Sequence, residues 1–115
     1  MKVSNYIAEL IFRIDNKQNP PLSRFEKQIK LLAASNEKEA YQLALIAATK
    51  ELDDHSDNDL YQWEFAGLGV LHPTEHPDAV VEGNSIIDNP VNEQEFLQFL
   101  RIRNASLQSK LAISA

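Results

Sequence analysis

The chain has 115 residues, of which 43% are hydrophobic and 24% are charged, a balance typical of one soluble globular domain. Eleven Lys and Arg against seventeen Asp and Glu give a net charge of −6, which argues against nucleic acid and anionic membranes as partners. Because the chain contains no cysteine, disulfides, Cys-ligated zinc, iron–sulfur clusters and thiol catalysis are excluded.

Two strands and a helix are predicted in the first half of the chain. Alternating apolar residues predict strands over residues 5–14 and 25–33, joined as an antiparallel hairpin by a polar, Pro-containing loop. Apolar residues then recur every three or four positions, which predicts a helix over residues 37–52. Asn36 followed by Glu39 is a capping-box pattern that marks the start of this helix.

Two further strands and a second helix are predicted in the other half. A strand over residues 60–71 contains Gly67 and Gly69, which indicate a bulge or a close backbone approach. A less regular strand is predicted over residues 79–87, and a helix over residues 93–111, which begins with an Asn92-x-x-Glu95 capping pattern. Aromatic residues alternate along the strand over residues 60–71, namely Tyr61, Trp63 and Phe65. This pattern favours a role in the core over a surface on which nucleic-acid bases stack.

The predicted elements follow the order ββαββα. This order indicates an α+β fold with a mainly antiparallel four-stranded sheet and helices packed on one face. We expect a single domain over residues 1–115, with its core within residues 5–111 and a frayed tail at residues 112–115. We expect a cytoplasmic protein, because no stretch approaches the roughly 20 apolar residues that span a bilayer and no leader peptide is recognisable.

Four stretches of the chain resemble a small bacterial protein family, the domain of unknown function 4288. They are YIAELIFRI (residues 6–14), FEKQIKL (25–31), ASNEKEA (34–40) and WEFAGL (63–68). The resemblance extends over roughly residues 5–87, although residues 82–87 keep only part of the end of the family's second hairpin. It implies a shared fold and a bacterial source, and it carries over no catalytic residue.

A short histidine motif is the nearest approach to a metal site. The spacing of His72, Glu75 and His76 matches the H-x-x-E-H pattern of inverted zinc peptidases. Pro73 and Pro77 bias both histidines away from helical geometry, so we expect a loop and no catalytic zinc. The three residues stay weak candidates for adventitious zinc or nickel, and no catalytic residue, cofactor-binding residue or cofactor is assigned.

Other charged groups are interpreted as surface features. The acidic run at residues 53–59 lacks the Gly and the Glu that an EF-hand loop requires, which favours a solvated loop over a calcium site. Glu9 and Arg13 are interpreted as a surface pair at the sheet edge, with a buried polar pair at a site as the alternative.

Charge is unevenly distributed along the sequence. Residues 1–35 carry six basic and three acidic groups, residues 36–89 carry two and twelve, and residues 90–115 carry three and two. This distribution suits self-association or docking of a charged partner, with solubility alone as an equal alternative. If the carboxylates of residues 36–89 gathered on one face, they would instead suit a nucleic-acid mimic.

The predicted sheet carries more apolar surface than the chain can cover. The strands over residues 5–14 and 60–71 are apolar on both faces, whereas two helices cover one face of a four-stranded sheet. We therefore predict a non-enzymatic interaction module that self-associates through its sheet as a homodimer, or that binds another protein. The alternative is a small-ligand binder or minor enzyme with a pocket near Gly67, Gly69 and the loop from His72 to His76.

Overall fold

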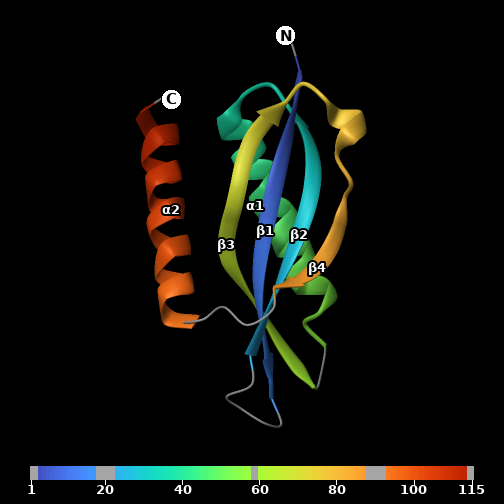
Figure 1. The fold of residues 1–115 in the computed structure, drawn as a ribbon, viewed down its shortest axis with the longest axis vertical. Helices are drawn as coiled ribbons and strands as arrows, with labels where there is room; N and C mark the ends of the chain where they lie inside the picture. The colour runs from blue at the N-terminus through green and yellow to red at the C-terminus, as the bar shows by residue number, and fades with distance from the viewer. Residues whose placement is uncertain (1–2, 18–22, 58–59, 88–92, 114–115) are drawn as a thin grey trace.

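The structure is a computed structural model that describes residues 3–17, 23–57, 60–87 and 93–113. Four strands, two α-helices and one short 3-10 helix follow one another in the predicted ββαββα order (Figure 1). In chain order they are β1 (Ser4–Asn16), β2 (Ser23–Ala34), α1 (Glu37–Asp54), β3 (Tyr61–Thr74), η1 (Pro77–Ala79), β4 (Gly83–Ile87) and α2 (Glu93–Ile113).

One antiparallel sheet of four strands has the order β3-β1-β2-β4, which confirms the α+β class. The predicted hairpin of β1 and β2 is present, and β3 pairs with the other edge of β1. Leu10, near the middle of β1, lies opposite Gln28 on one side and Leu68 on the other. The first strand of the chain is therefore an interior strand, with backbone neighbours on both sides.

Helix α1 covers one face of the sheet and comes close to it. Its N-terminus is capped as predicted, because the Asn36 side chain accepts a hydrogen bond of 2.8 Å from the Glu39 N–H. Its inward face carries small, buried alanines. Two of them, Ala44 and Ala48, form a core cluster with four residues of the sheet, namely Ala8, Leu10, Phe12 and Leu68. The ring of Phe12 contacts both Trp63 and Phe65, so these two members of the aromatic row belong to the core.

Helix α2 does not share the face of α1, which corrects the expectation that the helices pack on one face. Its Phe96 ring lies 4.9 Å from the Phe25 ring, and Leu100 is buried with Phe25 and Ile11 on the opposite face. Leu107, further along α2, packs against the core beneath α1. The helix thus runs beside β3 at the sheet edge (Figure 1), since α1 already fills the other face.

A pair of bulges in β3 confirms the expectation drawn from its glycines. The β1–β3 register shifts between Glu9 and Leu10 and again between Ile11 and Phe12. Gly67 has φ +137°, a conformation that side-chain-bearing residues rarely adopt. A Cβ atom there would lie 2.6 Å from Asn104 Nδ2, so α2 approaches β3 as closely as the backbone allows.

The ends of several elements differ from the sequence-based bounds. The weak strand predicted over residues 79–87 is shorter, because Pro77 begins the 3-10 helix η1 and β4 starts only at Gly83. Helix α2 continues to Ile113, into the predicted tail, whereas Asn92 lies outside the described residues. Within the described part of the chain, no helix is both long and apolar enough to cross a membrane.

The substitution Gly67→Ala tests the contact between β3 and α2. We expect it to lower the free energy of unfolding by about 1–3 kcal/mol, because the positive φ and the nearby Asn104 amide both disfavour a Cβ atom. Gly83→Ala is the matched control, since a Cβ at Gly83 has no atom within 4 Å, and its effect should stay within about 0.5 kcal/mol. Urea denaturation of both variants measures the difference, and equal effects would contradict this explanation.

Candidate functional site

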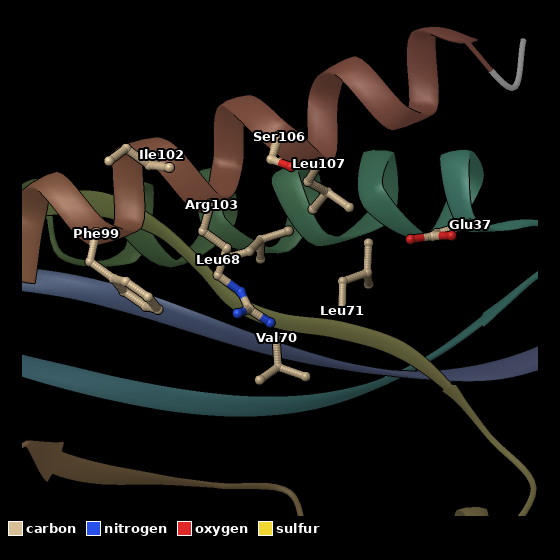
Figure 2. Close-up of a pocket in the computed structure, with 9 residues that line it drawn as sticks. All are labelled: Glu37, Leu68, Val70, Leu71, Phe99, Ile102, Arg103, Ser106 and Leu107. Atoms are coloured by element: carbon tan, nitrogen blue, oxygen red, sulfur yellow. The ribbon is translucent and has the colours of Figure 1, made fainter.

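An open groove of about 500 Å³ lies between β3 and α2, where the alternative pocket was predicted (Figure 2). Gly67 and Gly69 flank Leu68, which lines this groove, whereas residues 72–76 do not line it. The expectation of a loop from His72 to His76 was wrong for its first three residues, because β3 continues to Thr74 in register with β1. Six apolar side chains form most of its surface, namely Leu68, Val70, Leu71, Phe99, Ile102 and Leu107. Three polar residues complete it, namely Glu37, Arg103 and Ser106.

The side chain of Asn104 ties α2 to β3 beside the groove. Its Oδ1 accepts a hydrogen bond of 3.0 Å from the Leu68 N–H, and its Nδ2 donates to the Leu68 carbonyl at 3.2 Å. The same Nδ2 also donates to the Leu100 carbonyl within α2. One amide therefore occupies the backbone donor and acceptor that a further strand would use, and it fixes the distance between helix and strand.

The two charged residues of the groove lie at different places along it. Arg103 extends from α2 across the groove toward Val70, and Glu37 lies at the far end, in the first turn of α1 (Figure 2). Arg103 is exposed and forms no ion pair within the described residues. Its guanidinium thus lies over an apolar wall with its hydrogen-bond donors available.

A second candidate surface is the sheet face opposite α1. Figure 1 shows α1 behind the sheet, and no described helix lies in front of β1 and β2. Four half-buried apolar side chains share this face in the strand register, namely Ile7, Ile29, Leu31 and Val70. Helix α2 covers only the part of the face around Ile11 and Phe25. The described chain therefore leaves apolar surface in the middle of the sheet.

Glu9 and Arg13 lie on this same face but not at a sheet edge, because β1 is an interior strand. Arg13 forms an ion pair of 3.1 Å with Asp15 rather than with Glu9. The Glu9 carboxylate lies over Gly69, where an added Cβ would be only 2.7 Å from Glu9 Oε1. The interpretation as an edge pair was therefore wrong, since periodicity alone does not reveal the order of strands.

A buried polar cluster, consisting of Glu26, Gln28, Glu51 and His55, was missed by the sequence analysis. Gln28 is 1% exposed, and its Nε2 donates to Glu51 Oε1 at 3.0 Å and to Glu26 Oε1 at 3.3 Å. His55 Nε2 lies 3.2 Å from the same Glu51 oxygen. The His55 ring also stacks on Trp63, with ring centroids 3.8 Å apart. The cluster thus ties the end of α1 to β2 and β3.

The residues of the histidine motif are exposed and are not brought together. His72 Nδ1 lies 3.0 Å from the Pro73 carbonyl, and the His76 N–H donates to Thr74 Oγ1. Within the part of the chain that the structure describes, no three His, Asp or Glu side chains are grouped to hold a metal ion. Of the acidic run, Asp53 and Asp54 end α1, and residues 58–59 lie outside the described residues.

Comparisons with known proteins do not add to this geometry. No protein-family model, no curated protein and no solved structure matches the chain. The resemblance to the domain of unknown function 4288 therefore stays a prediction.

The substitution Gln28→Glu tests the buried polar cluster. Burial beside Glu26 and Glu51 raises the folded-state pKa of the introduced carboxyl above its unfolded value of about 4.3. Stability is therefore lost as the pH rises between these two values, and it returns at acid pH. We expect about 3 kcal/mol less stability than wild type at pH 8 and a deficit below about 1 kcal/mol at pH 4.

Urea denaturation at both pH values measures this difference. Gln42→Glu is the matched control, because Gln42 is exposed on α1 and the same change there should alter stability by less than about 0.5 kcal/mol. A deficit for Gln28→Glu that does not change with pH would show that the introduced charge is not its cause.

Proposed function

We propose that this chain is a cytoplasmic, non-enzymatic interaction module that forms a homodimer through the sheet face opposite α1. The observation that carries the proposal is the apolar surface around Ile7, Ile29 and Leu31, which no described helix covers. Antiparallel sheets that face water on one side are usually polar on that side, so an apolar outer face favours a partner. The family resemblance supports a bacterial source.

The charges on this face favour a second copy of the chain as the partner. Glu9 and Lys27 are half-buried on neighbouring strands of the same face, and neither forms an ion pair within the described residues. A twofold dimer brings each surface against itself, so Glu9 of one protomer can face Lys27 of the other. Opposite charges within one patch therefore make the face complementary to itself.

The energetic case rests on apolar area rather than on these charges. A stable interface buries about 800 Å² on each partner, with its affinity concentrated in a few central apolar residues. Leu31 and Ile7 are direct cross-strand neighbours, and both lie in the part of the face that α2 leaves uncovered. We therefore expect these two residues to lie at the centre of the dimer contact.

The substitution Leu31→Glu tests the dimer. Size-exclusion chromatography with light scattering should give twice the chain mass of 13.0 kDa for the wild type at micromolar concentration. Leu31→Glu should raise the dimer dissociation constant at least about tenfold, because the interface would then bury an unpaired charge. Ile46→Glu is the control, since Ile46 is 64% exposed on α1, behind the sheet, and the dimer should be unaffected.

Two outcomes would contradict this proposal. One is a wild-type monomer at high micromolar concentration. The other is an equal loss of the dimer in the Leu31→Glu and Ile46→Glu variants, which would place the contact elsewhere or indicate a general effect of added charge.

Small-ligand binding is a second candidate function, favoured by the groove between β3 and α2. Its volume of about 500 Å³ lies within the range of about 300–1,000 Å³ that is common for small-molecule sites. Most of its lining is apolar and a few polar groups converge on it, which is the usual composition of such sites. The groove lies at the β3 edge, whereas Ile7 and Leu31 do not line it.

A further inference from the structure

We infer that the groove between β3 and α2 binds an amphipathic monocarboxylate, with its apolar chain along the β3 wall and its carboxylate on Arg103. The inference deepens the second candidate function and rests on it. It does not use the centre of the proposed dimer contact, because Leu31 and Ile7 lie outside the groove, and Val70 is the residue that both surfaces share.

The apolar side chains of the groove favour a ligand with a hydrocarbon chain. Leu68 and Leu71 come from β3 and Leu107 from α2, so apolar side chains lie on both sides of the groove (Figure 2). At its open side, Phe99 and Ile102 are 58% and 63% exposed. A flexible hydrocarbon chain would cover these side chains and remove their surface from water.

The guanidinium of Arg103 favours a carboxylate as the head group of the ligand. A guanidinium presents paired N–H donors that match the two oxygens of a carboxylate, and such charge-assisted bonds strengthen away from bulk water. Arg103 forms no ion pair within the described residues, so binding a carboxylate breaks no existing pair. Arg103 is exposed without a ligand, and a hydrocarbon chain bound along Val70 and Leu68 would shield the same donors from water.

The charges of the groove favour a ligand with one negative charge. Arg103 is the one cation among its described lining residues, and Glu37 lines the end formed by α1. A second negative charge on the ligand would therefore have no cation of its own in the groove, and the chain as a whole is acidic, at −6. The groove therefore favours a single carboxylate over a dicarboxylate or a phosphate monoester.

Calorimetric titration of the full chain with decanoate tests the inference, with 1-decanol and decanedioate as comparison probes. Decanoate should bind at least about tenfold more tightly than either comparison probe. Arg103→Gln should raise the dissociation constant for decanoate about tenfold and leave that for decanol unchanged. Arg101→Gln is the matched control, because it removes the same charge two positions away on α2. Arg101 does not line this groove but lines two other cavities, together with Arg13.

Ser106→Trp gives a second, steric test, since an indole in the groove should abolish binding of decanoate and decanol alike. The inference is overturned by the absence of binding heat, by equal affinity for decanoate and decanol, or by an equal effect of Arg101→Gln and Arg103→Gln.

Light scattering on the same samples separates the two proposals. Leu31→Glu should keep decanoate binding while it weakens the dimer, and Arg103→Gln should keep the dimer.

Discussion

The contact between the Asn104 amide and the backbone of Leu68 determines how α2 packs against the edge of the sheet. It requires a residue without a side chain at Gly67, because the amide occupies the space where a Cβ would lie. With this contact made, α2 covers the free edge of β3 and does not lie flat on the sheet. An edge strand that would otherwise invite pairing with other chains is thereby protected at its bulge.

Both candidate surfaces follow from this placement of α2. Because the helix stands at the edge, its apolar residues serve both faces: Leu100 packs on one side of the sheet and Leu107 on the other. The middle of the outer face stays uncovered, and the groove forms between α2 and β3, from Leu68 to Leu71 on the strand. A surface for a partner and a site for a ligand thus arise from one geometric constraint.

Local features of the fold could be predicted from the sequence, and long-range ones could not. The cap at Asn36 depends on residues close in sequence, and glycines within a strand pattern are themselves a local signal of a bulge, so both patterns were informative. Apolar residues at helical spacing, such as Phe96 and Leu100, indicate that α2 has a buried face, but this spacing does not specify which side of a sheet the face meets. The burial of Gln28 could not be predicted from its strand alone, because Glu51, the partner that makes this burial tolerable, lies 23 residues away.

The stacking of His55 on Trp63 gives the molecule an optical property. Trp63 is the chain's single tryptophan, so its indole dominates the intrinsic fluorescence. A ring stacked directly on an indole, here with centroids 3.8 Å apart, alters the emission of that indole. Emission from this protein therefore reports on the junction of α1 with β3, without any attached dye.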